Sequence, residues 1–252
     1  MTRQLRRPRL ADVVADQLRA RILSGELPDG SMLPKQDELL EEFRVSPPSV
    51  REALRILEAE GLVTVQRGNV GGAVVHEPKA AKAAYMLAMV LERKQVVLDD
   101  VSRGIARLEP ACAAACAERS DRARAVLPGL AASIADAEAG LDDPEVFASA
   151  ARTFHERLVG ACGNETLMVV VGAVEAIWSG QVRETRAQGR SMAVIKDRAS
   201  REQALDEHRA LYAAIEAGDA DRAERLDREH LSGRYEHPKL GRGEIVRAAP
   251  VD

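Results

Sequence analysis

The sequence predicts a mainly α-helical protein in two parts, with three helices and a β-hairpin followed by an all-helical bundle. Three observations support this class. Apolar residues recur at helical spacing through most of the 252 residues. Two short runs of β-type residues lie between residues 62 and 76, and no strand-like alternation follows them up to Tyr235. Pro78 and the alanine-rich stretch after it mark the boundary between the parts.

Turn and capping residues separate the predicted elements of the N-terminal part. Ser46 can cap a helix that starts at Pro47, because proline tolerates the first helical position, and Gly61 ends this helix. Two β-type runs then flank a glycine-rich connection, which is typical of a hairpin. The predicted helices span 10–23, 36–43 and 46–60, and the predicted strands span 62–66 and 73–76. Residues 1–77 are therefore expected to form a winged helix-turn-helix domain.

The C-terminal part shows only helical patterning. Asp143, Asn164 and Asp219 are helix start signals, because their short polar side chains can cap the first turn. The predicted helices span 80–92, 96–119, 121–139, 143–162, 165–189, 197–217 and 219–235. We expect an all-α domain over residues 80–237 and a disordered tail over the polar residues 238–252.

Composition excludes several classes of protein. With 3% aromatic residues, the chain lacks the exposed rings that RNA-stacking platforms and sugar-binding clefts use. No stretch approaches the roughly 18 to 20 apolar residues of a spanning helix, and the arginine-rich start lacks the apolar segment of a secretory signal. Three cysteines fit reduced thiols better than a disulfide framework. The sequence predicts a cytoplasmic protein with no membrane partner.

The third predicted helix carries a polar face suited to double-stranded DNA. Arg51 and Arg55 lie one turn apart and can meet phosphate oxygens or the acceptor edge of guanine in the major groove. Backbone N–H groups at the start of the preceding helix favour a phosphate there, and a glycine at the hairpin tip allows close approach to a minor groove. The predicted DNA-binding residues are Lys35, Ser46, Ser49, Arg51, Arg55, Arg67 and Gly68.

An alternative interpretation is that these arginines are ordinary solvated residues paired with surface carboxylates. Residues 1–78 contain 11 Lys or Arg and 12 Asp or Glu, and the formal net charge of the chain is −4. Total charge therefore gives no reason to expect a nucleic-acid partner. The DNA hypothesis depends on the pattern of helices, hairpin and arginines.

Several motifs carry a resemblance to a known family. The run from Gly25 to Pro34 and the segment from Val45 to Val63 resemble the winged-helix domain of GntR-family bacterial transcription regulators over about residues 8–77. The helical half resembles the FadR subfamily with its FCD effector domain, through Phe154-His155, Gly163-Asn164, Glu207-His208 and Gly218-Asp219 running on to His230. The resemblance implies a ligand-responsive repressor that binds a palindromic operator as a homodimer, with a small organic acid as effector.

Three histidines form a candidate metal site. His155, His208 and His230 lie on three different predicted helices, and converging imidazoles can bind zinc or nickel. From the residues alone, a histidine on an apolar face is more often a core residue. The resemblance implies that these three residues are ligands of Zn²⁺ or another divalent transition metal, and that Asn164 lies at the effector site. The aspartate that the family carries four residues before the first histidine is Ala151 here.

Two further departures from the family affect specificity. Family members usually carry arginines at the positions of Asp37 and Pro47 as well as at Arg51, so we expect an operator that differs from the common family sequence. An arginine that meets an acidic effector in many members corresponds to Ile105. The effector is therefore expected to be less acidic than usual, or the pocket to be partly vestigial.

Two other functions remain open. An effector-independent DNA-binding protein with a vestigial pocket would bind DNA without a ligand response. A zinc-dependent hydrolase would use an open position on a three-histidine metal, but the sequence offers no HExxH pattern and no Ser/His/Asp arrangement. The chain is therefore predicted not to be an enzyme.

Overall fold

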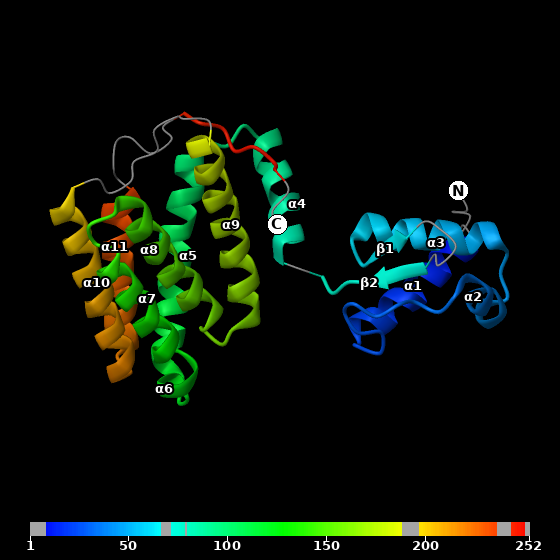
Figure 1. Ribbon diagram of the computed structural model, residues 1–252, viewed down its shortest axis with the longest axis horizontal. Helices are drawn as coiled ribbons and strands as arrows, with labels where there is room; N and C mark the ends of the chain where they lie inside the picture. The colour runs from blue at the N-terminus through cyan, green and yellow to red at the C-terminus, as the bar shows by residue number, and fades with distance from the viewer. Residues whose placement is uncertain (1–8, 67–71, 79, 188–196, 236–242, 250–252) are drawn as a thin grey trace, which may run out of the picture. The chain divides into compact units, whose positions relative to one another are not determined.

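The computed structural model describes residues 9–66, 72–78, 80–187, 197–235 and 243–249 (Figure 1). The chain divides into two compact units, Met1–Lys79 and Ala80–Asp252, and each is described by itself. The N-terminal unit contains α1 (Leu10–Leu23), α2 (Gln36–Phe43), α3 (Pro47–Glu60), β1 (Val63–Gln66) and β2 (Gly72–Val75). All five elements predicted for this unit are confirmed within one residue at each end.

The N-terminal unit packs its helices and hairpin around one apolar core. Strands β1 and β2 pair antiparallel, with Val63 opposite Val75. Every element contributes apolar residues to the core; the helices do so at helical period, and β1 contributes Val63. The fully buried members of the core include Leu18, Leu39, Leu57 and Val75. The connection between the strands, which contains Arg67 and Gly68, lies outside the described residues.

The end of α3 is held by contacts, whereas its start lacks the predicted side-chain cap. At its end, Gly61 adopts a positive φ of 73°, and its N–H donates to the carbonyl of Glu58. Nε and a terminal nitrogen of Arg19 on α1 donate to the two carboxylate oxygens of Glu60 at 2.8 and 2.6 Å, and this bidentate pair raises the pKa of Arg19. At its start, the Ser46 hydroxyl contacts the Ser49 hydroxyl at 3.1 Å and makes no capping bond to the backbone.

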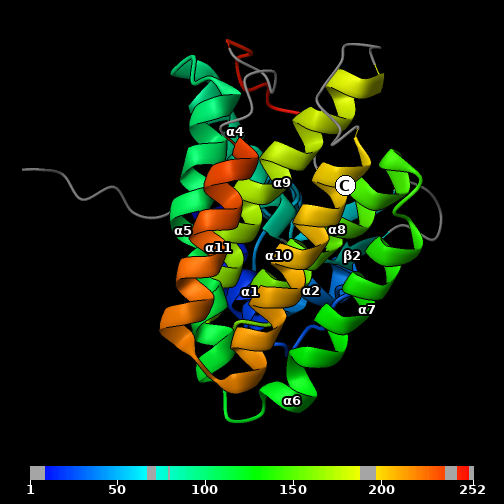
Figure 2. The same cartoon turned by 90° about the vertical axis from the view of Figure 1, so that its left-hand side faces the viewer.

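The C-terminal unit is an antiparallel helical bundle (Figures 1 and 2). Helices α5, α8 and α10 pack against one another, α11 packs on α5 and α10, and α9 packs on α4, α5 and α8. Its helices are α4 (Ala80–Arg93), α5 (Leu98–Glu118), α6 (Arg122–Ala125), α7 (Leu127–Ala139), α8 (Pro144–Gly160), α9 (Glu165–Ala187), α10 (Arg198–Ala217) and α11 (Ala220–Tyr235).

One predicted helix is divided in the structure. The sequence analysis expects a single helix over 121–139, but α6 ends at Ala125 and α7 begins at Leu127, with Val126 at φ −115° and ψ −58° between them. The cause is Pro128, which has no N–H to donate to the carbonyl four residues earlier and whose ring clashes with that carbonyl. The prediction of one continuous helix was wrong because it did not treat Pro128 as a helix-breaking residue.

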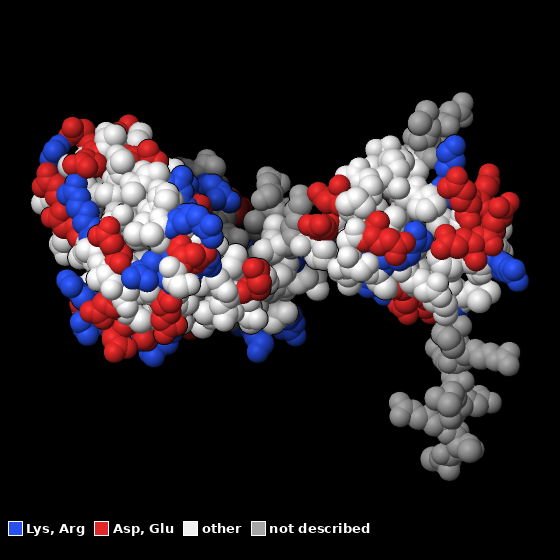
Figure 3. Space-filling view, turned by 90° about the horizontal axis from the view of Figure 1, so that it is seen from below, with Lys and Arg blue, Asp and Glu red and all other residues white. Residues whose placement is uncertain are grey.

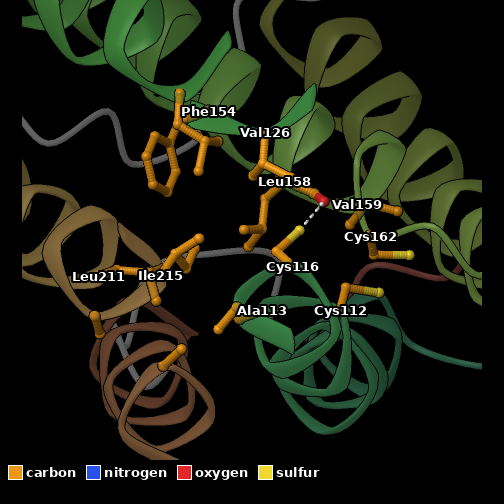
Figure 4. Close-up of a cluster of buried hydrophobic side chains, with 14 of the residues drawn as sticks. Cys112, Ala113, Cys116, Val126, Phe154, Leu158, Val159, Cys162, Leu211 and Ile215 are labelled. Carbon is orange, nitrogen blue, oxygen red and sulfur yellow. Dashed lines mark hydrogen bonds between the residues drawn. The ribbon is translucent and has the colours of Figure 1, made fainter. Parts of the chain in front are cut away.

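The main core of the bundle contains all three cysteines as free thiols (Figure 4). The thiol of Cys116 donates to the carbonyl of Leu158 at 3.3 Å, which ties α5 to α8. Burial raises the pKa of Cys116 to about 12. This thiol therefore stays protonated at neutral pH and acts as a small apolar packing group.

A C-terminal segment, Gly243–Ala249, packs on the bundle, so the expectation of disorder over residues 238–252 is wrong for residues 243–249, while residues 238–242 and 250–252 lie outside the described residues. The N–H of Leu98 donates to the carbonyl of Glu244 at 2.7 Å, and the N–H of Val246 donates to the carbonyl of Val96 at 2.9 Å. Val246 is 0% exposed in a cluster with apolar residues of α4, α5 and α9. Polar composition predicted disorder, but one buried valine and a paired backbone order this segment.

The Glu92 carboxylate holds the same segment to α4. It accepts from the N–H of Ala248 at 2.8 Å and from the guanidinium of Arg247 at 3.0 Å. These hydrogen bonds lower the pKa of Glu92, the backbone one contributing most. The segment therefore joins α4 to the rest of the unit through both polar and apolar contacts.

We expect Val246→Ala to lower the free energy of unfolding of the C-terminal unit by about 2 kcal/mol, because buried methyl groups are lost and a cavity remains. Urea unfolding followed by the fluorescence of Trp178, the one tryptophan of the chain, measures this. The matched control is Val146→Ala on α8, where the valine is 51% exposed and the expected change is within about 0.5 kcal/mol. Equal effects of the two substitutions would contradict the packing described for residues 243–249.

Candidate functional site

The exposed face of α3 presents two arginines. Val50 and Leu57 are fully buried on the opposite face, so the helix is fixed with Arg51 and Arg55 toward solvent. Arg51 has no ion-pair partner among the described residues. Arg55 lies 3.4 Å from Glu52, but both side chains are exposed, and such pairs contribute little to stability. Both guanidinium groups are therefore available to an incoming anion.

The remaining predicted contacts are placed around the start of α3. Ser46 is exposed, Ser49 is half-buried, and their hydroxyls contact each other. Lys35 is exposed at the start of α2, where its backbone N–H donates to Glu38 at 2.9 Å. Together with the two arginines, they place polar groups on the helix-turn-helix surface.

Sequence reasoning missed one basic residue on this surface. Arg44 is exposed in the turn between α2 and α3 and adopts a positive φ of 52°. Its signal in the sequence is its position, since a basic residue in the turn of a helix-turn-helix lies close to the start of the second helix. Arg44 is therefore added to the candidate DNA-binding residues.

Carboxylates limit this surface on the α2 side. Figure 3 shows acidic side chains gathered at the end of the N-terminal unit where Figure 1 draws α2. The exposed acidic residues of α2 are Asp37, Glu38, Glu41 and Glu42. These groups repel phosphate, so α2 itself is a poor phosphate-binding element and the arginines of α3 carry the positive potential.

The structure brings the three predicted histidines together inside the C-terminal unit. His155 comes from α8, His208 from α10 and His230 from α11, and they are 5%, 1% and 6% exposed. Nε2 of His155 lies 3.3 Å from Nε2 of His208 and 3.3 Å from Nε2 of His230. The ring of Phe154 stacks on His208 with centroids 4.1 Å apart. Three ring nitrogens from three helices therefore face one point.

Carboxylates orient two of these rings. Nδ1 of His155 donates to Glu109 at 2.5 Å, and Nδ1 of His230 donates to Glu207 at 2.6 Å. A carboxylate accepts, so each Nδ1 carries a proton, and in the neutral form of each ring Nε2 presents a lone pair. Lone pairs that face each other repel unless a cation lies between them. The tautomers are thus those that metal-ligating histidines adopt.

The spacing of the nitrogens fits a divalent metal. Zinc–nitrogen bonds of about 2.0–2.1 Å place the nitrogens of a tetrahedral site about 3.3 Å apart. The Nε2 atom of His155 lies 3.3 Å from the Nε2 atoms of both His208 and His230. Ala151, which is buried on α8 one turn before His155, supplies no oxygen. The residues present therefore offer three nitrogen ligands.

Sequence reasoning missed the acidic partners of the histidines. Glu109 is 0% exposed and interrupts the apolar face that Ile105 and Cys112 form on α5. Glu207 directly precedes His208, and Asp227 is buried one turn before His230. A charged residue on a face that is otherwise apolar is the signal that could have identified Glu109 and Asp227.

The other expected effector residues lie elsewhere. Asn164 is exposed, and its side-chain oxygen accepts from the N–H of Leu167 at 3.1 Å, which caps the start of α9. It is not among the described contacts of the three histidines. Ile105 is buried in the cluster that contains Val246. Arg107, two residues after Ile105, is exposed and does not join this apolar cluster.

Comparisons with known proteins match both parts of the chain to known families. The family model of the FCD domain matches residues 104–233, and that of bacterial regulatory proteins of the gntR family matches residues 10–74. The chain is 29% identical over 211 residues to the HTH-type transcriptional regulator LutR of Bacillus subtilis, covering 84% of this chain and 93% of LutR. It is 30% identical over 226 residues to an Escherichia coli regulatory protein named for the L-lactate dehydrogenase operon, covering 89% and 84%.

A solved structure shares the fold. The GntR protein of Streptococcus agalactiae superposes with a TM-score of 0.68 at 21% identity, covering 89% of this chain and 98% of that one. Among the described helices, none is long and apolar enough to cross a bilayer.

Proposed function

Because the chain belongs to the GntR family of bacterial transcription regulators and carries an FCD domain, we propose that it is a ligand-responsive repressor that binds a palindromic operator as a homodimer. GntR proteins bind DNA, FCD domains bind small-molecule effectors, and the family consists of regulators and not enzymes. Access to chromosomal DNA implies a cytoplasmic location.

Helix α3 is the element that enters the major groove. It is the second helix of the helix-turn-helix, and its exposed Arg51 and Arg55 are one turn apart. A guanidinium can donate two parallel hydrogen bonds to a guanine edge or to phosphate oxygens. Arg44 and Lys35 can add phosphate contacts. Since the acidic face of α2 opposes binding, affinity depends on these few contacts, and each phosphate contact adds about one unit to the salt dependence of binding.

Dimerisation follows from the small number of base pairs that one recognition helix can contact. One recognition helix contacts too few base pairs for specificity, and a two-fold protein dimer matches a palindromic site. We expect two chains per operator by multi-angle light scattering of the complex, and a dimer for the free protein. One chain per operator would contradict this proposal.

The histidine cluster supports a metal-dependent effector site. His155, His208 and His230 would hold Zn²⁺ or another divalent transition metal, which would supply a Lewis-acidic position for a carboxylate of the effector. Glu109 and Glu207 fix the rings of His155 and His230 in the required orientation. The convergence of the three Nε2 atoms is the observation that carries this proposal.

A small organic acid is the effector class that this site favours. Ile105 provides no guanidinium, so the protein's own contribution to binding a carboxylate would pass through the histidine-held cation. The relative named for the L-lactate dehydrogenase operon is consistent with a small acid as signal. The same apolar Ile105 favours the second candidate, an effector-independent DNA-binding protein, and a thermal-shift screen of small acids with and without zinc separates the two.

We expect Arg51→Ala to weaken operator binding by about 1–3 kcal/mol, because a bidentate contact to a base edge is lost. Fluorescence anisotropy at fixed salt, on an operator selected from random-sequence DNA, measures this. The control is Arg124→Ala, which removes an exposed arginine from α6 of the C-terminal unit and is expected to leave affinity unchanged. Unchanged affinity of the Arg51 variant would contradict the assignment of α3 as the reading helix.

We expect Ala151→Asp to raise zinc affinity at least about tenfold, because a carboxylate one turn before His155 can join the same ion. His208→Ala should abolish binding, since two nitrogen ligands remain. Zinc titration against a competing chromophoric chelator measures both, with thermal melting beside it. If neither the parent nor the Ala151→Asp protein is stabilised by zinc, the histidines are a hydrogen-bonded core cluster, and the new aspartate will destabilise the fold with or without zinc.

A further inference from the structure

The C-terminal segment Gly243–Ala249, here called the C-terminal strap, pairs with the turn between α4 and α5. Val97 and Ile245 form an antiparallel β-bridge. The backbone hydrogen bonds of the strap with Val96 and Leu98 lie on either side of this bridge. The strap is drawn in red in Figure 1. It therefore adds a short strand to the chain that joins the first two helices of the C-terminal unit.

Helix α9 holds the other side of the strap. The side-chain oxygen of Gln181 accepts from the N–H of Arg247 at 2.9 Å. The hydroxyl of Thr185 donates to the carboxylate of Glu244 at 3.4 Å. Gln181 and Thr185 are both buried, and buried polar side chains are unfavourable without hydrogen bonds. These contacts specify where on α9 the strap lies.

Helix α4 has few large side chains of its own in the core. Its buried residues are Ala84 and Ala88, and Leu87 and Leu91 are partly buried. Among the helices, α4 packs mainly on α9. Since an alanine side chain buries little apolar area, these contacts are modest. The fully buried Val246 of the strap and the bonds of the strap to the α4 carboxylate therefore supply a substantial part of what holds α4.

The turn that the strap covers is the point at which α4 would pivot. Gln95, between α4 and α5, has a positive φ of 56°, which is uncommon for a residue other than glycine. Such a conformation persists when the surrounding structure fixes it. The backbone groups of Val96 and Leu98, directly after it, are bonded to the strap. The strap therefore immobilises this turn.

The position of α4 matters for the DNA-binding unit because the chain connects the two directly. Strand β2 ends at Val75, and α4 begins at Ala80. Helix α4 is therefore the element by which the N-terminal unit is attached to the bundle along the chain. If α4 leaves the bundle, the tether of the DNA-binding unit gains the 14 residues of this helix.

We propose that the C-terminal strap is a clasp that holds α4 on the bundle and thereby sets the operator spacing that the protein accepts. This rests on the proposed function, a dimer on a palindromic operator. With α4 held, each DNA-binding unit is attached at a fixed point, so two recognition helices fit two half-sites at one spacing. With α4 released, the longer tether accepts several spacings, and the effective concentration of the second unit at its half-site falls.

Hydrogen–deuterium exchange of the full chain tests the clasp. Glu92→Ala removes the acceptor of two bonds to the strap. We expect amide exchange in α4 to become at least about tenfold faster, and that in α5 and α10 to stay the same, because only a local opening is favoured. The matched control is Glu216→Ala on α10, an exposed position with the same change of charge, which should alter no helix. Unchanged exchange in α4, or equal acceleration in every helix, would overturn the clasp.

Fluorescence anisotropy on two operators tests the consequence for DNA. One operator is selected from random-sequence DNA, and the other carries two extra base pairs between its half-sites, which turn one half-site by about a fifth of a helical turn. We expect the parent to bind the longer operator more weakly. The ratio of the two Kd values should fall at least about threefold in Glu92→Ala and in Val246→Ser, which opens the clasp from its apolar side, and should not change in Glu216→Ala.

The outcomes separate this inference from the proposed function. Faster exchange in α4 together with a reduced Kd ratio supports the clasp. A ratio that is equal in the parent and both strap variants, or a parent that binds both operators equally, overturns the inference and leaves the operator-binding dimer standing. A parent that binds one chain per operator overturns both.

Discussion

The hydrogen bond between His155 and Glu109 is the contact on which the C-terminal unit depends. Both side chains are almost completely buried, and an imidazole or a carboxylate left alone in a core is strongly unfavourable. Their pairing therefore fixes the register of α8 against α5. His208 and His230 reach the same ring nitrogen of His155, which adds α10 and α11 to the arrangement. A polar centre defines how the apolar faces of four helices meet.

Much of the fold was predictable, because it depends on local rules. Helical period, glycine and proline signals and a hairpin pattern located the elements of the N-terminal unit within one residue. The errors occurred where a local rule was outweighed or missed. Pro128 divides α6 from α7, and residues around Val246 are ordered by a tertiary contact that polar composition does not reveal.

In the candidate sites, too, local features were predictable from the sequence and tertiary contacts were not. Placing His155, His208 and His230 on three helices was possible from the sequence, and their convergence agrees with what the family resemblance implied. The acidic partners of these histidines were not predicted. The helical period of apolar residues shows which face of its helix a residue occupies, but it does not show which helix faces pack together. Glu109 and His155 are 46 positions apart, and His155 and His230 are 75 positions apart. Only packing brings such positions together.

The ordered segment around Val246 has a consequence for the synthesis of this chain. The contacts of Arg247 and Ala248 with Glu92 span 155 and 156 positions, so α4 leaves the ribosome long before its last partner exists. The N-terminal unit closes its core within its own residues and can fold while translation continues. The α4 surface that later covers Val246 stays open to solvent throughout that interval. A chaperone that acts on the nascent chain would find its apolar target there.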